Sequence, residues 1–190
     1  MSVYPESIAA IMRSLRCVGE CEREDAAGKS ASFVCGSFVR IGLQIEPATK
    51  FLESIRYKTN GCGYAVAASE FIASRFQNIN LTDLAGITDL ESNLTSTLNA
   101  NTEGRTHCID IAVEAFRNAL ADYRRRTVEE FQGEDALICS CFGVSEREIV
   151  ELMKDRGTSD IESVGKVCNA GTGCGSCQML IQELIDAREQ

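Results

Sequence analysis

Two close pairs of cysteines in the last third of the chain constrain it more than any other feature. Cys139 and Cys141 have one residue between them, and Cys174 and Cys177 have two. A [2Fe–2S] cluster suits such a set, because its two irons together take four thiolates. Zinc also binds four thiolates, but its cysteine pairs usually have about two to four residues between them. The spacing therefore favours a [2Fe–2S] cluster, with zinc as the alternative.

Glycines around the second pair point to the same chemistry. The run 170–177 reads Ala-Gly-Thr-Gly-Cys-Gly-Ser-Cys, so a glycine stands on each side of Cys174. Because glycine has no Cβ, the backbone can come close to a cluster and direct its N–H groups at sulfur. A closed set of four thiolates in such a loop should hold a cluster permanently.

Composition and charge exclude several classes of protein. Of the 190 residues, 44% are apolar, which predicts one or two domains with a true core. The net charge of −9 argues against nucleic acid as a partner, because phosphate binding needs a positive surface. No apolar run has the length of a membrane span, and the N-terminus lacks a secretory pattern. Ten cysteines without an export signal indicate reduced thiols and a cytoplasmic protein.

The sequence predicts an α+β protein with two domains. The acidic segment 128–136 is interpreted as a linker between residues 1–127 and residues 137–190. In the first domain, alternating apolar residues predict strands over 39–45 and 55–59. Helical spacing predicts helices over 64–76 and 109–123, with weaker ones between 82 and 98. We therefore expect a short antiparallel sheet packed by helices.

The second domain is predicted to be small and all-α. Ser145 and Glu148 have the spacing of a capping box, and Gly157 is placed to end the helix that follows. A second capping signal begins at Ser159, and Cys177 should open a final helix. A unit of this size buries little apolar surface, so a cluster would act as its staple.

Three further cysteines are predicted to lie at the ends of elements rather than inside them. Cys35 comes just before the first predicted strand, Cys62 enters a helix between two glycines, and Cys108 follows the only histidine, His107. Loops at element ends present chemistry, and helix N-termini make thiols nucleophilic. Ordinary buried cysteines are the alternative, since free cysteine is common in cores. For Cys17, Cys21 and Cys168 we prefer that structural interpretation.

At these residues the chain resembles a known family. The motifs Cys-Gly-Ser at 35–37, Gly-Cys-Gly at 61–63 and His-Cys at 107–108 resemble the three ligand loops of the NifU/IscU-type iron–sulfur cluster scaffold. The region 138–177 is similar to the bacterioferritin-associated-ferredoxin-like (BFD-like) [2Fe–2S] domain. NifU carries both domains in this order, so the resemblance covers nearly the whole chain.

The resemblance implies a scaffold and carrier rather than an enzyme. Cys35, Cys62 and Cys108 would hold a transient [2Fe–2S] or [4Fe–4S] cluster, iron or zinc, and His107 would be a further ligand or would orient Cys108. A cysteine desulfurase would supply sulfur, with Cys108 as the first candidate acceptor, and apo iron–sulfur proteins would receive the cluster. The C-terminal cluster would supply or relay the electrons that reduce this sulfur. A homodimer is left open.

Ser37 is among the residues that depart from the family pattern, and two other functions are alternatives to the scaffold. Ser37 stands where the family has an aspartate associated with cluster release, so transfer from this chain could be slower. The first competing function is a [2Fe–2S] electron-transfer protein whose N-terminal domain only docks a partner. The second is an oxidoreductase subunit or redox sensor. All three scaffold cysteines are present, which favours the scaffold.

Overall fold

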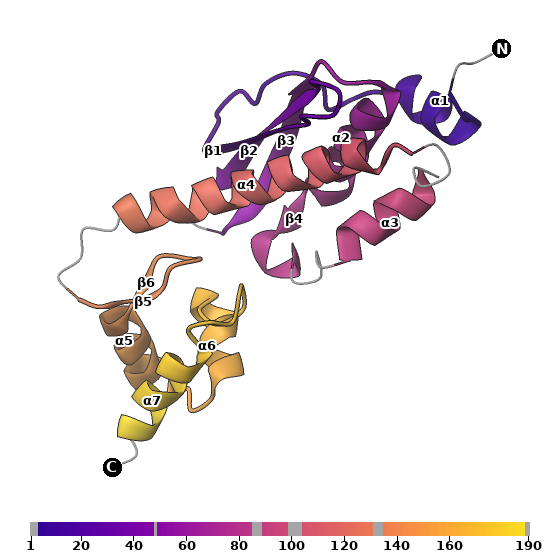
Figure 1. The fold of residues 1–190 in the computed structure, drawn as a ribbon. Coiled ribbons are helices and arrows are strands. Elements are labelled where there is room, and N and C mark those ends of the chain that lie inside the picture. Colours follow the sequence, from indigo (N-terminus) through magenta and orange to yellow (C-terminus); the bar gives the residue numbers. More distant parts are fainter. Residues whose placement is uncertain (1–3, 48, 85–88, 99–103, 131–134, 189–190) are drawn as a thin grey trace. The chain divides into compact units, whose positions relative to one another are not determined.

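The computed structural model describes residues 4–47, 49–84, 89–98, 104–130 and 135–188. It divides into two compact units, Met1–Tyr123 and Arg124–Gln190, and the division falls within a long helix. Figure 1 shows the elements of each unit. The two units are described separately below.

The first unit is built on one antiparallel sheet. Its strands are β1 (Ala26–Ala31), β2 (Phe38–Glu46), β3 (Phe51–Thr59) and β4 (Ile79–Asn80), and they lie in that order. The alternation that predicted β2 is realised, since Val39, Ile41 and Ile45 are fully buried. The predicted second strand is the C-terminal part of β3, which pairs with β2 from Val39↔Thr59 to Glu46↔Phe51.

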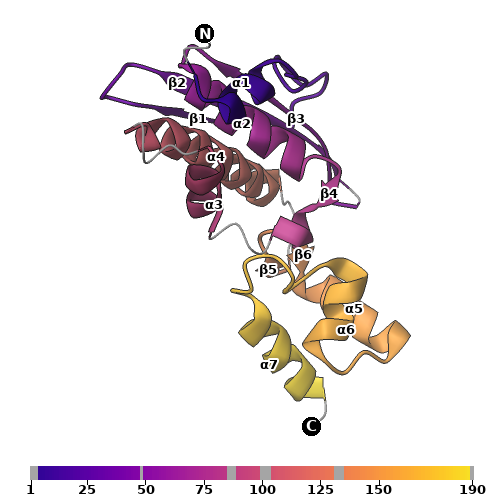
Figure 2. The ribbon, with the colours of Figure 1, turned by 90° about the vertical axis from the view of Figure 1, so that its right-hand side faces the viewer.

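Helices pack against this sheet (Figure 1, Figure 2). They are α1 (Glu6–Met12), α2 (Gly63–Phe76), the 3-10 turn Leu81–Leu84, α3 (Leu90–Thr97) and α4 (Thr106–Glu130). Helix α2 contacts β2 and β3, and α1 packs on α2. A single apolar core joins sheet and helices, with Tyr57 and Phe116 among its largest buried side chains. The expected α+β class, a short antiparallel sheet with helices, is therefore confirmed.

Strand β1 was not predicted, because the sequence Ala-Ala-Gly-Lys-Ser-Ala contains no β-branched or aromatic residue. Side chains of helix α4 stabilise this strand by hydrogen bonds to its backbone. The Asp122 carboxylate accepts a bond from the Ala27 N–H at 3.1 Å, and the Asn118 amide donates to the Lys29 carbonyl at 3.0 Å. Cys35 lies just before β2, which is the first predicted strand, but the presence of β1 makes β2 the second strand of the unit.

The second unit is mainly helical, as predicted. It contains a two-stranded ladder, β5 (Leu137–Cys139) and β6 (Val144–Ser145), which the sequence analysis missed because such short strands carry no period. Its helices are α5 (Glu146–Arg156), α6 (Ile161–Cys168) and α7 (Gln178–Arg188). Helix α4 ends at Glu130, inside the segment 128–136 that was interpreted as a linker, and residues 131–134 lie outside the described part.

Capping residues fix the helix ends of this unit. The capping box between Ser145 and Glu148 is confirmed, and Gly157 ends α5 in the left-handed conformation at φ 64°. The capping signal at Ser159 is realised one residue later. The carboxylate of Asp160 accepts bonds from both the N–H and the hydroxyl of Ser163 at 2.8 Å, which is a stronger cap than a lone hydroxyl.

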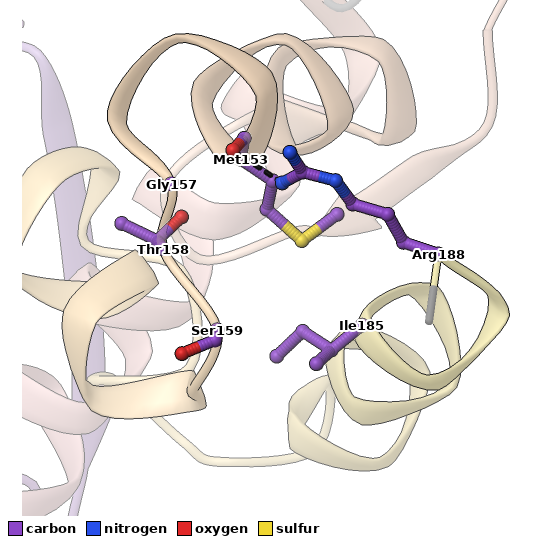
Figure 3. A pocket seen from close by; sticks show the side chains of 6 residues that line it. All are labelled: Met153, Gly157, Thr158, Ser159, Ile185 and Arg188. Carbon is purple, nitrogen blue, oxygen red and sulfur yellow. Dashed lines mark hydrogen bonds between the residues drawn. The ribbon is translucent and has the colours of Figure 1, made fainter. Parts of the chain in front are cut away.

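A small cavity of about 180 Å³ lies where α5 ends and α7 passes it. Figure 3 shows the Arg188 side chain reaching back to the Met153 carbonyl, to which its guanidinium donates a hydrogen bond. A cation at this position stabilises the free carbonyls at the C-terminal end of α5. No cysteine lines the cavity, whose walls are Met153, Gly157, Thr158, Ser159, Ile185 and Arg188.

Candidate functional site

In the first unit, the loops that carry Cys35 and Cys62 are tied together at one end of the sheet. The Phe38 N–H donates to Asn60 Oδ1 at 2.8 Å, and the Thr59 hydroxyl donates to the Phe38 carbonyl at 2.5 Å. A Cβ placed on Gly61 would lie 3.5 Å from the Cβ of Ser37. The β1–β2 loop and the β3–α2 loop therefore meet directly.

Two sulfur atoms come close together in the site. The Sγ atoms of Cys62 and Cys108 lie 3.5 Å apart, although the residues belong to the starts of different helices, α2 and α4. Cys62 is half-buried and is the N-cap residue of α2, whereas Cys108 is fully buried. The Gly63 N–H donates to the Tyr4 hydroxyl at 3.1 Å, so an aromatic side chain helps to fix the start of α2.

Cys35 is the exposed member of this set. Its Sγ lies 3.2 Å from the Ser37 hydroxyl, and His107 is near enough to lower the pKa of the thiol by hydrogen bonding. The Nε2 atom of His107 is buried and has no hydrogen-bond partner. A buried imidazole nitrogen with a free lone pair or proton suits a metal ligand, so the residues present fit a metal or cluster.

Cys35 and Cys108 differ sharply in the pKa of their thiols. Hydrogen bonds from Ser37, then Ser32 and His107, lower the pKa of Cys35 to about 6. Burial, followed by the neighbouring Cys62, raises the pKa of Cys108 to about 12. The expectation that the Cys108 thiol has a low pKa is therefore wrong. Desolvation of a fully buried thiol outweighs the field of its helix N-terminus.

The sequence analysis missed two apolar side chains beside Cys35. Phe33 and Val34 lie in the loop after β1 and are almost fully solvent-exposed, at 105% and 80%. Apolar residues before a strand are easily taken for part of it, and only the turn at Gly36, with φ 70°, separates them from β2. Two exposed apolar side chains thus immediately precede the exposed thiol of Cys35 in the chain.

In the second unit, the two predicted cysteine pairs converge. Cys141 Sγ lies 3.4 Å from Cys174 Sγ, while Cys139 interacts with both Cys141 and Cys177. All but Cys174 are buried. Hydrogen bonding with Cys141 is the largest cause that lowers the pKa of Cys139, and the same bond raises the pKa of Cys141 to about 12.

The glycine run forms a close cradle for this set. A Cβ on Gly173 would lie 3.2 Å from both Cβ and Sγ of Cys141, which is tighter than ordinary packing. Gly171 and Gly175 have φ values of 83° and 76°, which favour glycine. A backbone hydrogen bond from Gly171 also lowers the pKa of Cys139. Four converging thiols with N–H donors at sulfur fit a [2Fe–2S] cluster.

The remaining cysteines make separate structural contacts. Cys17 is fully buried, and its N–H donates to the Glu70 carboxylate at 3.2 Å. Cys21 contacts the Ser54 carbonyl at 3.9 Å, and Cys168 donates to the carbonyl four residues earlier in α6. Across the described residues, no three or more His, Cys, Asp or Glu side chains surround one point as ligands of a single ion. The candidate sulfurs lie in pairs.

None of the helices in the described ranges combines the length and the apolar character that crossing a membrane requires.

Comparison with known proteins identifies both regions. Residues 3–130 match the model of the NifU-like N terminal domain, and residues 137–187 match that of the BFD-like [2Fe–2S] binding domain. The nitrogen fixation protein NifU of Nostoc sp. is 29% identical over 90% of this chain. The chain covers 57% of that relative. The mitochondrial iron sulfur cluster assembly protein 1 of Eremothecium gossypii is 26% identical over 64% of this chain and 73% of its own.

A solved structure shows a fold similar to that of the first unit. The N-terminal part of a nitrogen-fixing NifU-like protein from Brucella abortus superimposes with a TM-score of 0.55 at 14% identity. The match covers 65% of this chain and 96% of the other. With the family model matching well over half of its residues, this chain belongs to the NifU-like N-terminal domain family.

Proposed function

We propose that this chain is an iron–sulfur cluster assembly scaffold. It builds a transient cluster on Cys35, Cys62 and Cys108 and passes it to apo-proteins, while its second unit keeps a [2Fe–2S] cluster. The observation that carries the proposal is the close Cys62–Cys108 pair, 3.5 Å between sulfurs, beside the unpartnered Nε2 of His107. This arrangement occurs in a chain of the NifU-like family.

The exposure of the three thiols supports a site that releases its cargo. Cys62 and Cys108 are held by two helices, whereas Cys35 sits in a solvent-exposed loop. An incoming ligand from an acceptor protein can displace an exposed thiolate more readily than a buried one. His107 is proposed as a fourth ligand through Nε2. Iron is the intended metal, and zinc would also suit these ligands.

Phe33 and Val34 support protein partners at this loop. Two exposed apolar side chains next to Cys35 would cost solubility without a contact to make. We assign to this surface the docking of a cysteine desulfurase, which delivers sulfur, and of apo iron–sulfur proteins, which receive the cluster. The exposed, low-pKa thiolate of Cys35 replaces Cys108 as the candidate sulfur acceptor.

The second unit is proposed to retain its cluster. Cys139, Cys141, Cys174 and Cys177 would hold it, and when bound it would supply one-electron redox chemistry. Three of these thiols are buried, and Gly173 leaves no room between its loop and Cys141. Opening such a site would disturb the core of the unit. The chain has no turnover chemistry of its own in this proposal, and its free cysteines suit the cytoplasm.

Iron and acid-labile sulfide per chain test the proposal. Protein isolated anaerobically should contain about two irons in the second unit. Incubation with iron and inorganic sulfide should raise the iron content further in the parent, and not in the triple variant Cys35→Ala, Cys62→Ala, Cys108→Ala. The added iron should then move to an apo-ferredoxin. If the parent gains no more transferable iron than the triple variant, the scaffold proposal fails and electron transfer by the second unit alone is favoured.

A further inference from the structure

The Cys62–Cys108 pair has the arrangement of a dithiol that can close. A disulfide needs the sulfurs about 2.05 Å apart, so the two Sγ atoms at 3.5 Å would approach by about 1.5 Å. Rotation about the Cα–Cβ bonds is the motion that would bring the two sulfur atoms together. Both residues stand at helix starts that are fixed by packing, Cys62 by Gly63 against Tyr4 and Cys108 within the core. The pair is therefore preorganised for oxidation.

Cys35 gives this pair a supply of sulfur to reduce. Of the three thiols, Cys35 alone is exposed, so a bulky sulfur donor meets it first. Its loop is held against the Cys62 loop through the Ser37–Gly61 approach, and Cys35 is among the charges that act on Cys108. A sulfur atom attached to Cys35 is thus carried by the loop that meets the Cys62 loop, within electrostatic range of Cys108.

We propose that Cys62 and Cys108 act as an internal two-electron reductant, which converts sulfane sulfur received by Cys35 into sulfide. This inference rests on the proposed scaffold function and deepens it. The substrate class is a persulfide, R–S–SH, carried by a protein or by a small thiol. The product, sulfide, is the form of sulfur that can bridge irons.

The reaction balances in three transfers. The Cys35 thiolate attacks the outer sulfur of R–S–SH, which releases R–S⁻ and leaves Cys35–S–SH. The Cys108 thiol gives up its proton, which R–S⁻ takes, as its sulfur takes over the outer sulfur and returns Cys35 to its thiolate. The Cys62 thiolate then attacks the inner sulfur of Cys108–S–SH, forming the Cys62–Cys108 disulfide and expelling HS⁻. In total, R–S–SH and two thiols give R–SH, H₂S and one disulfide, so the thiols lose the two electrons that the sulfane sulfur gains.

This reductant lies within one compact unit. The sequence analysis assigned the electrons to the C-terminal cluster, but the dithiol supplies the first pair without it. One sulfide is made per chain, and a second round requires an external thiol or dithiol to reopen the disulfide.

The test uses the whole chain with the cluster of the second unit in place and the first unit reduced and free of metal, under anaerobic conditions with one equivalent of glutathione persulfide. Sulfide is trapped and quantified, and non-reducing peptide mapping locates disulfides. We expect a Cys62–Cys108 cross-link in step with the release of about one sulfide per chain. Cys62→Ser should accumulate persulfide on Cys108 and release several-fold less sulfide. Cys35→Ser should slow the whole sequence several-fold. Cys21→Ser, which removes a half-buried thiol of the same unit, should behave as the parent.

Two outcomes overturn the inference. One is sulfide release by Cys62→Ser at the rate of the parent, and the other is release accompanied by a different cross-link, such as Cys35–Cys108. A parallel experiment with iron and inorganic sulfide distinguishes failure of the dithiol-reductant inference from failure of the scaffold function. If clusters form from sulfide but not from persulfide without added reductant, the scaffold stands and the dithiol reductant does not. If neither source gives a cluster on the first unit, the scaffold function itself is wrong.

Discussion

Replacing Ser37 with alanine should raise the pKa of Cys35 in the metal-free protein. The Ser37 hydroxyl lies 3.2 Å from Cys35 Sγ, and its side chain and backbone N–H are the two largest causes that lower this pKa from 9.0 to about 6. Alanine removes the hydroxyl and keeps the N–H. The bonds from Ser32 and His107 also remain. The pKa should therefore move part of the way back toward 9.0.

The size of the effect decides which assay to use. With a pKa of about 6, about 90% of Cys35 is thiolate at pH 7, against about 1% at the ordinary pKa of 9.0. The gain in rate is smaller than this ratio, because a thiolate of lower pKa is also a weaker nucleophile. With a Brønsted coefficient of about 0.45, a pKa that is lower by about three reduces the rate constant of the thiolate roughly 20-fold. Cys35 should therefore react only about five times faster than an ordinary exposed cysteine. The midpoint of the pH profile is the more sensitive readout.

The assay is alkylation by iodoacetamide between about pH 5 and pH 9, with the Cys35 peptide quantified by mass spectrometry. We expect a midpoint near 6 for the parent and a higher one for Ser37→Ala. Ser176→Ala is the matched control, since Ser176 Oγ lies 3.2 Å from Cys174 Sγ and belongs to the other unit. The reasoning fails if the parent titrates near pH 9, or if the Ser37→Ala midpoint equals that of the parent.

Three further changes test the packing around the sites. Gly28→Ala would place a Cβ 2.1 Å from the Ala115 carbonyl oxygen, so the first unit should lose about 3 kcal/mol or more in a urea titration; an unchanged midpoint would contradict the β1–α4 contact. Gly173→Ala presses on Cys141 from 3.2 Å, and the protein should retain less iron in the second unit during gel filtration with a chelator than the parent does. Phe33→Ser should leave thermal unfolding within about 0.5 kcal/mol of the parent while slowing sulfur delivery from a desulfurase; equal delivery rates would remove the docking role of this side chain.

The elements that could be predicted are those whose own residues show a strand or helix periodicity or a capping motif. Strand β2 follows from the alternation that ends in Ile41, Leu43 and Ile45, all fully buried, and α5 follows from its capping box and Gly157. Strand β1 could not be predicted, because its stability comes from partners far along the chain. Asp122, which is 95 residues away in the sequence, accepts a hydrogen bond from this strand. Gly28 lies against the backbone of α4, where a side chain would not fit.

In the candidate site, too, features set by the local sequence were predictable and features set by the tertiary structure were not. Spacing alone selected the cysteines that converge, including the Cys141–Cys174 contact at 3.4 Å. Acidity was predicted wrongly at Cys108, because helix position is visible in a sequence and depth of burial is not. The exposed pair at Phe33 and Val34 was missed for a similar reason, since only the structure reveals which apolar residues leave the core.

The two cysteine sets differ in how they take part in their units. In the first unit a large apolar core joins the sheet to its helices, and it includes only Cys108 of the three candidate thiols among its buried residues. That core is complete without a cluster, so we expect the first unit to stay folded when a bound cluster leaves. In the second unit, Cys139, Cys141 and Cys177 are themselves among the buried residues, next to a modest set of apolar side chains such as Ile149 and Ile181. When thiols occupy buried positions in a small unit, the apolar core is smaller, and the stability of the unit would depend more on the cluster that the thiols bind. The proposed difference between release in the first unit and retention in the second therefore rests on where each unit places its sulfur relative to its core.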